Sequence, residues 1–112
     1  MKKIEAIVRP AKLEALKEAF LKADIKGMTI SEVHGCGNQH GWKEFYRGSE
    51  IIVNTLPKIK FEVVVADSKV QSTVDLIVET AKTGEVGDGK IFILPVEEVV
   101  RIRTSESGEV AI

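Results

Sequence analysis

The chain has 112 residues and nearly balanced charge, with 16 basic and 17 acidic side chains and a formal net charge of −1. This length suits one domain with one hydrophobic core, which we expect to span residues 1–112. The charge balance argues against a nucleic-acid-binding protein, because such proteins carry a basic excess that neutralises phosphates. No apolar run approaches the roughly 18 residues of a membrane span, so we expect no insertion into a membrane.

Two features favour a cytoplasmic protein. The first ten residues, MKKIEAIVRP, lack the apolar stretch of a secretory signal. The single cysteine, Cys36, cannot form a disulfide within the chain, as is typical of proteins in a reducing compartment. We therefore expect a cytoplasmic location.

The first half of the chain predicts a strand, a helix and a second strand. A β-branched run at residues 2–9 precedes Pro10, which suits the first turn of a helix. Residues 10–24 repeat apolar side chains at helical spacing, and Gly27 follows where that helix ends. Residues 28–35, MTISEVHG, then predict a strand.

The second half predicts the same order of elements. Residues 58–67 form an apolar, β-branched run that predicts a third strand. Ser68 and Gln71 have the spacing of a capping box at the start of a second helix, and Gly84 stands where a C-terminal glycine belongs. The remaining predicted elements are a fourth strand at 90–100 and a short fifth strand at 99–104.

The chain looks like two copies of one supersecondary unit. A shift of 57 positions places Ile4 on Phe61, Leu13 on Val70, Phe20 on Ile77 and Leu21 on Val78. This order predicts an α+β fold, the ferredoxin-like double βαβ with an antiparallel sheet and a long loop between the second and third strands.

The two runs FEVVVA, at 61–66, and IFIL, at 91–94, are apolar at nearly every position, so we expect burial on both sides of the sheet. Two helices can cover only one face of a four-stranded sheet. We therefore expect a homo-oligomer whose sheets pack inward. The alternative is a monomer whose open face is partly shielded by the last ten residues.

The segment GCGNQHGWKEFYRGSE, residues 35–50, differs from the rest of the chain. The connection between Gly37 and Pro57 covers roughly twenty residues, whereas connections longer than about 12–15 residues are uncommon and usually functional or disordered. Its glycines expose backbone donors, and its aromatic residues and arginine are types enriched at interface hot spots. A functional loop is favoured over a disordered insertion, because disordered segments contain few aromatic residues.

Two further stretches could bind an anion. The segment GEVGDGK, 84–90, matches the phosphate-loop pattern, but Ile91 replaces the Ser or Thr that holds magnesium, and the segment joins a helix to a strand. Its glycines and final lysine still suit an anion, the alternative being a helix end followed by a tight turn. Arg101 and Arg103 share one face of the expected strand and suit a polyphosphate, although such arginines are more often only solvated.

No catalytic residue is predicted. No motif arranges Ser, His and Asp as a triad, and His34 and His40 have no partner at zinc-ligand spacing. Cys36 lacks a neighbouring base, and we expect a small buried thiol there.

Taken together, several motifs strongly resemble the PII nitrogen-signalling family: GMTISEVHGCGNQHG, YRGSE, LPKIK, TGEVGDGKIF and VVRIRT. The resemblance covers essentially the whole chain, and the pair YRG and TGxxGDGKIF is its most specific part. It implies a homotrimer of ferredoxin-like subunits that binds ATP or ADP in clefts between subunits. It also implies a non-catalytic sensor of nitrogen, carbon and energy status that regulates partner proteins.

The resemblance assigns roles to three segments: a partner-binding T-loop at about 37–56, a phosphate-binding B-loop at about 83–90 and a C-terminal segment at about 97–112. The residues expected to hold phosphates are Gly87, Asp88, Gly89 and Lys90, with Arg101 and Arg103 of the neighbouring subunit. Those expected around the adenine are Ile7, Val64, Met28 and Thr29. Backbone groups at Gly35, Cys36, Gly37, Gly41 and Gly87 complete the ligand shells.

The resemblance also implies a mechanism. Gln39 ligates Mg²⁺ and Lys58 pairs with 2-oxoglutarate, so the metal bridges ATP and the metabolite and the two bind cooperatively. Because Gln39 lies at the root of the T-loop, metal binding rearranges that loop. In relatives the arginine matching Arg47 blocks the pore of an ammonium channel. An ammonium transporter, contacted by Tyr46 and Arg47, is therefore the expected partner and would bring the protein to the membrane; nitrogen-metabolism enzymes or regulators are further candidates.

The chain departs from the family pattern at several positions. Ile51 stands where many relatives carry a uridylylated tyrosine, which excludes that modification here. Ser49 matches a position that some relatives phosphorylate, and His40 replaces the commoner lysine.

Two other hypotheses stay open. The first is a phosphate-ester hydrolase of the acylphosphatase type, which would use the arginines and glycine loops as anion clamps. The second is a trimeric metal-binding protein, which the lack of a His, Cys and carboxylate cluster disfavours.

Overall fold

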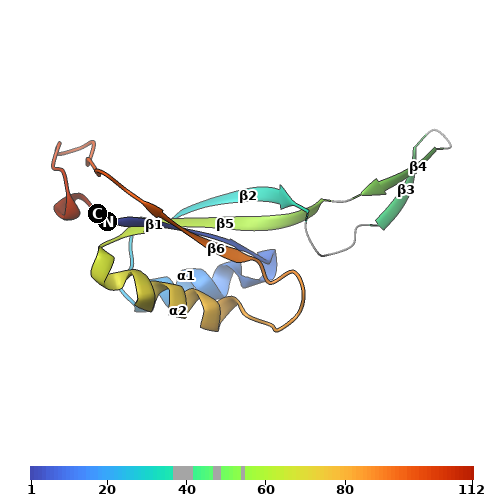
Figure 1. Cartoon of the computed structure of the whole chain (residues 1–112), viewed down its shortest axis with the longest axis horizontal. Helices are drawn as coiled ribbons and strands as arrows, with labels where there is room; N and C mark the ends of the chain where they lie inside the picture. Colours follow the sequence, from blue (N-terminus) through green and yellow to red (C-terminus); the bar gives the residue numbers. More distant parts are fainter. Residues whose placement is uncertain (37–41, 47–48, 54) are drawn as a thin grey trace.

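The computed structural model describes residues 1–36, 42–46, 49–53 and 55–112. Two helices cover one face of a four-stranded antiparallel sheet with strand order β2–β5–β1–β6 (Figure 1). The elements are β1 (Lys2–Val8), η1 (Pro10–Lys12), α1 (Leu13–Lys22), β2 (Thr29–Gly35), β5 (Leu56–Val65), η2 (Asp67–Lys69), α2 (Val70–Ala81), β6 (Lys90–Pro95) and η3 (Glu109–Ala111). This arrangement confirms the predicted α+β, ferredoxin-like fold.

The core lies between the helices and the two central strands. Every second residue of β1 and β5 is buried, because side chains alternate between the faces of a strand. The rings of Phe20 and Phe61 meet edge to face, with centroids 5.2 Å apart. The predicted internal repeat is confirmed, since Phe20 and Ile77 are both buried while Leu21 and Val78 are both exposed.

The predicted first residue and the predicted C-terminal glycine of the second helix are both wrong. The turn η2 precedes α2, so Lys69 is the N-cap residue and no side chain caps it; Ser68 lies inside the turn instead. The hydroxyl of Thr73 donates to the Lys69 carbonyl at 2.7 Å. The helix ends at Ala81, and Gly84, with φ of +89°, lies in the loop that follows.

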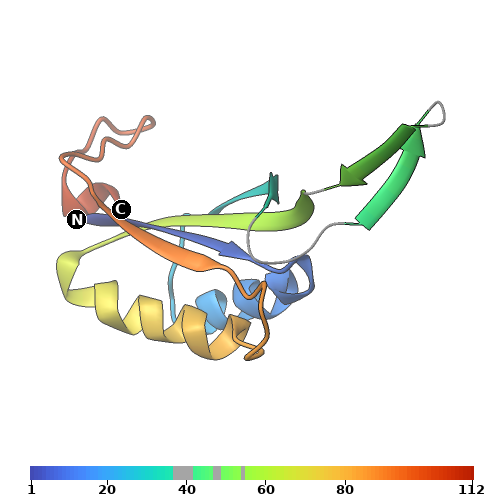
Figure 2. The same ribbon diagram turned by 45° about the vertical axis from the view of Figure 1, so that its right-hand side comes forward.

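The long connection contains a hairpin that the sequence analysis did not predict. β3 (Trp42–Tyr46) pairs with β4 (Ser49–Val53), and both project away from the four-stranded sheet (Figures 1 and 2). Aromatic and β-branched residues favour strands, which accounts for the pairing.

The open face of the sheet is partly charged on β1 and β5, and its burial against further copies of the chain stays a prediction. Lys3 of β1 forms ion pairs with Glu5, at 3.1 Å, and with Glu62 of β5, at 2.8 Å. On β6 the same face is apolar, since Phe92 and Leu94 are exposed in the single chain. The C-terminal residues do not shield this face, because they lie at the end of the sheet that holds the N-terminus (Figures 1 and 2).

The predicted fifth strand is also absent from the described residues. Beyond β6 the chain forms turns and one isolated bridge between Val100 and Ser107.

Candidate functional site

A pocket of about 420 Å³ opens where β1 and β2 end and β5 and β6 begin. Its wall is formed by the ends of these strands, the residue that follows β2 and the loop between α2 and β6. The lining residues are Ile7, Gly35, Cys36, Leu56, Lys58, Phe92 and the segment 85–90. Because Cys36 is exposed in this wall, the expectation of a buried thiol is wrong.

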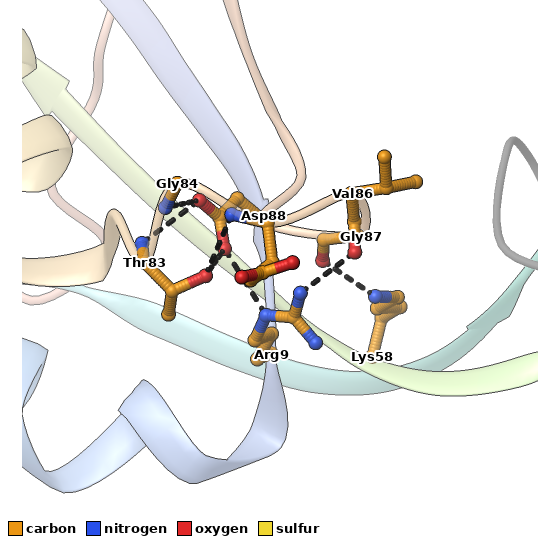
Figure 3. Close-up of polar contacts among 8 residues, drawn as sticks. Arg9, Lys58, Thr83, Gly84, Val86, Gly87 and Asp88 are labelled. Carbon is orange, nitrogen blue, oxygen red and sulfur yellow. Dashed lines mark hydrogen bonds and ion pairs between the residues drawn. The ribbon is translucent and has the colours of Figure 1, made fainter.

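One carboxylate holds the loop between α2 and β6 in place. Asp88 accepts hydrogen bonds from the backbone N–H groups of Thr83, at 2.8 Å, and Gly84, at 2.9 Å, and from the Thr83 hydroxyl (Figure 3). Arg9 Nε donates to the same carboxylate at 3.1 Å. These donors, those of Thr83 above all, hold the pKa of Asp88 far below its usual range. The carboxylate is thus satisfied within the protein.

The glycines of this loop meet specific conformational demands. Gly89 has a φ of +103°, and a Cβ there would lie 1.6 Å from the Ile7 carbonyl oxygen, so the loop backbone lies directly on β1. Among the residues that the structure describes, the N–H groups of Gly87 and Gly89 take part in no hydrogen bond. Free backbone donors in a glycine turn can bind an anion.

Two cationic side chains bind the carbonyls of the same loop. Arg9 Nη2 donates to the Val86 oxygen at 2.7 Å, and Lys58 Nζ donates to the Gly87 oxygen at 2.8 Å (Figure 3). Partial burial, together with the charge of Arg9, lowers the pKa of Lys58. Positive charge is therefore concentrated beside the free N–H groups, and an anion entering the pocket would relieve the repulsion between these two cations.

Arg9 was missed by the sequence analysis. Its contacts with Val86 and Asp88 join residues 77 and 79 positions apart, so no local spacing could indicate them. The only signal was a cation at the end of a strand, directly before Pro10.

The structure brings half of the predicted ligand-binding residues together at this pocket. They are Ile7, Gly35, Cys36, Lys58, Gly87, Asp88, Gly89 and Lys90. Three further predicted residues, Gly37, Gln39 and Gly41, lie outside the described residues, as does Arg47 of the predicted partner contact.

The remaining predicted residues lie at the opposite end of the sheet. Ile7 faces Lys60 across the β1–β5 ladder, whereas Val64 faces Lys3, near the start of β1. Arg101 and Arg103 follow β6, whose six residues span about 20 Å from the pocket. Met28 and Thr29, at the start of β2, lie at this end too. A single chain therefore does not bring the two sets of residues to one ligand.

The C-terminal arginines lie in a turn instead of the predicted strand. The turn arises because Ser105, with φ of +59°, and Gly108, with φ of +82°, fold the chain back on itself. The prediction that Arg101 and Arg103 share one face of a strand is accordingly wrong.

Within the described part of the chain, no group of three His, Cys, Asp or Glu side chains is placed to hold a metal ion. The helices described there are also too short or too polar to cross a membrane.

Comparison with known proteins identifies the family. The model of the family described as nitrogen regulatory protein P-II matches residues 1–106. The chain belongs to the P-II family. Three P-II proteins align over 112 residues and 100% of both chains: those of Azospirillum brasilense at 55% identity, of Microchaete diplosiphon at 57% and, named P-II 1, of Escherichia coli K12 at 52%.

Membership of the P-II family gives the chain a role in nitrogen regulation. The relatives quoted are all named as nitrogen regulatory proteins, and none of these names denotes an enzyme.

Proposed function

We propose that the protein is a non-catalytic sensor that binds ATP or ADP and 2-oxoglutarate and regulates partner proteins through the segment 37–56. The nucleotide occupies a cleft between two copies of the chain, and three copies form a closed ring. The observation that carries the proposal is the division of the predicted ligand residues into two sets at opposite ends of one sheet. Two chains are needed to bring both sets to one nucleotide.

The pocket suits the phosphate end of a nucleotide. The N–H groups of Gly87 and Gly89 supply donors, and Lys58, Lys90 and Arg9 supply positive charge. Asp88 helps indirectly, because its carboxylate is engaged by Thr83 and holds the loop in shape. In this proposal Asp88 contributes its backbone to the phosphates.

The far end of a second chain suits the remainder of the nucleotide. Val64 and Ile7 would lie on either side of the adenine, one from each copy, with Met28 and Thr29 at its polar edge. Arg101 and Arg103 would approach the phosphates. The open face of the sheet, with Phe92 and Leu94 exposed in the single chain, supports packing of the sheets against one another.

Magnesium and 2-oxoglutarate complete the proposed site. Mg²⁺ binds mainly to phosphate oxygens and water, so one protein ligand, the amide oxygen of Gln39, suffices beside a nucleotide. Lys58 lies in the pocket wall and would pair with a carboxylate of 2-oxoglutarate. With the metabolite and ATP sharing one metal, each ligand strengthens binding of the other.

The regulated partner we propose is an ammonium transporter, contacted through Tyr46 and Arg47. Tyr46 is the last residue of β3, a strand of the hairpin that projects from the sheet (Figure 1). A large partner could contact this hairpin without disturbing the four-stranded sheet. The protein would work in the cytoplasm and associate with the membrane through that transporter.

Calorimetric titration with MgATP, alone and with saturating 2-oxoglutarate, tests the proposal. A metabolite that tightens ATP binding several-fold supports the bridged site. ATP binding without any response to the metabolite leaves a sensor of nucleotide alone. Absence of binding by either ligand, or turnover of an acyl phosphate, overturns the proposal. Sedimentation of the same samples checks for a trimer.

A further inference from the structure

The C-terminal segment is folded around Arg101. The Arg101 N–H donates to the Glu106 carbonyl at 2.8 Å, and the Arg101 carbonyl accepts from the Ser105 N–H at 2.8 Å. The guanidinium is held as well: Nη1 donates to Glu106 Oε1 at 3.1 Å and Nη2 to the Val110 carbonyl at 3.0 Å. Backbone and side chain of one residue are thus fixed by a single turn of chain.

Arg103, two residues on, differs from Arg101. Its side chain is exposed, and in the part of the chain that the structure describes it has no hydrogen bond or ion pair. The two arginines of the RIR motif are therefore not equivalent. Arg101 has a fixed orientation, whereas Arg103 keeps the freedom of a solvated side chain.

The contacts with Glu106 and Val110 leave part of the guanidinium available. Each contact uses one N–H, and a guanidinium carries further donors in the same plane. The Arg101 side chain is 36% exposed, so the other donors can reach a ligand without displacing Glu106. A planar group held in this way is already ordered for a two-point contact with an oxyanion.

We propose that Glu106 is a positioning residue for the nucleotide site: it orients Arg101 toward the phosphates bound by a neighbouring copy of the chain. This inference rests on the proposed function, because it needs a nucleotide between two chains. Arg101 then supplies directed hydrogen bonds and Arg103 supplies charge of less defined geometry. The opposite role, in which Glu106 occupies Arg101 and competes with the phosphate, would make the carboxylate an inhibitor of binding.

Substitutions at position 106 separate geometry from charge. In Glu106→Gln the amide oxygen can still accept the Arg101 hydrogen bond, although the charge is lost. In Glu106→Asp the charge remains, but the side chain is shorter by one methylene and cannot reach the same position. Glu106→Ala removes both properties.

The test is calorimetric titration of each variant with ADP, with unfolding temperature and sedimentation as checks on folding and assembly. We expect Glu106→Asp and Glu106→Ala to weaken ADP binding about three- to tenfold, the cost of ordering one long side chain on binding. Glu106→Gln should stay within about twofold of the parent protein. Glu109→Ala, at an exposed residue of the same segment, is the matched control and should bind like the parent.

A second comparison uses the arginines themselves. Because lysine cannot make a planar two-point contact, Arg101→Lys should weaken ADP binding by about tenfold or more, and Arg103→Lys by less than about threefold. Equal losses at both positions overturn the inference. So does tighter binding in Glu106→Ala, or a Glu106→Asp variant that binds better than Glu106→Gln. If the parent protein itself fails to bind ADP, the proposed function is overturned first, and the inference with it.

Discussion

The carboxylate of Asp88 accepts hydrogen bonds from both the backbone N–H and the hydroxyl of Thr83, five residues earlier in the chain. This closed turn leaves the free N–H groups of Gly87 and Gly89 in the pocket, and Arg9 ties it to the end of β1. The shape of the loop therefore depends on the charge state of one aspartate.

Acid should loosen this loop, and the direction follows from the pKa of Asp88. Its folded-state pKa lies below the unfolded value of about 3.9, so the stabilisation is fully present above that value and is lost as the pH falls from there through the lower folded-state pKa. We expect the urea concentration at the unfolding midpoint of the parent protein to decrease once the pH is lowered below about 5. Asp88→Asn should be less stable at pH 7 and should lose less on acidification.

The control for this prediction is Asp75→Asn, at an exposed position of α2. Its urea midpoints between pH 7 and pH 3 should run parallel to those of the parent protein. Parallel curves for Asp88→Asn as well would show that the carboxylate has no special role in the acid response.

Gly89 and Gly84 make a matched pair for a test of the loop backbone. Both have positive φ, +103° and +89°, but a Cβ at Gly89 would meet the Ile7 carbonyl oxygen at 1.6 Å, whereas nothing lies within 4 Å at Gly84. Gly84→Ala should cost about 1–2 kcal/mol of unfolding free energy, from backbone strain alone. Gly89→Ala should cost clearly more, because the loop must leave β1, and should also abolish ADP binding.

Chemical denaturation and ADP titration of the two variants give the comparison. A Gly89→Ala protein that keeps both the stability and the ADP affinity of Gly84→Ala would contradict the close packing of the loop on Ile7.

The elements of this fold were predictable because their patterns are local. The apolar, β-branched run along 58–67 and the helical spacing along 10–24 depend on neighbours in the sequence, and the repeat at 57 positions supplied the topology. The ends of elements were less predictable. The capping box at Ser68 failed because a 3₁₀ turn took the residues that the pattern assigned to a helix start.

The candidate site was predictable only in part, for a physical reason. The glycines and Lys90 stand together in the sequence, so their loop was visible as a motif. The hydrogen bonds from Arg9 to Asp88 and from Lys58 to Gly87 join residues that are 79 and 29 positions apart, so they form only in the completed fold. The turn that contains Arg103 is closed by backbone hydrogen bonds of Arg101 with Ser105 and Glu106, and a strand pattern does not reveal these bonds.

Phe20 and Leu21 are neighbours in α1, yet substitution by alanine should destabilise the protein strongly at Phe20 and hardly at all at Leu21. Phe20 is fully buried against Phe61, whereas Leu21 is 75% exposed. Phe20→Ala should lower the free energy of unfolding by about 3–5 kcal/mol, through lost contacts and a cavity. Leu21→Ala should change it by less than about 0.5 kcal/mol. Urea denaturation measures both, and a large loss in Leu21→Ala would show that this face of α1 is covered in the assembled protein.

Lys58 should decide the response to 2-oxoglutarate. Its ammonium lies in the pocket wall, 2.8 Å from the Gly87 carbonyl, and partial burial lowers its pKa, so a carboxylate there would stabilise the charged form. In Lys58→Gln we expect saturating 2-oxoglutarate to leave the MgATP affinity unchanged, while the parent protein gains several-fold. Binding of ADP, which involves no metabolite, should persist within about threefold, because the N–H groups of Gly87 and Gly89 remain.

Lys69→Gln, at an exposed residue of η2 far from the pocket, is the control and should respond to the metabolite like the parent protein. A Lys58→Gln protein that still couples the two ligands would assign the carboxylate contact to another cation of the pocket. Arg9 would then be the first candidate, since its guanidinium reaches the same loop through the Val86 carbonyl.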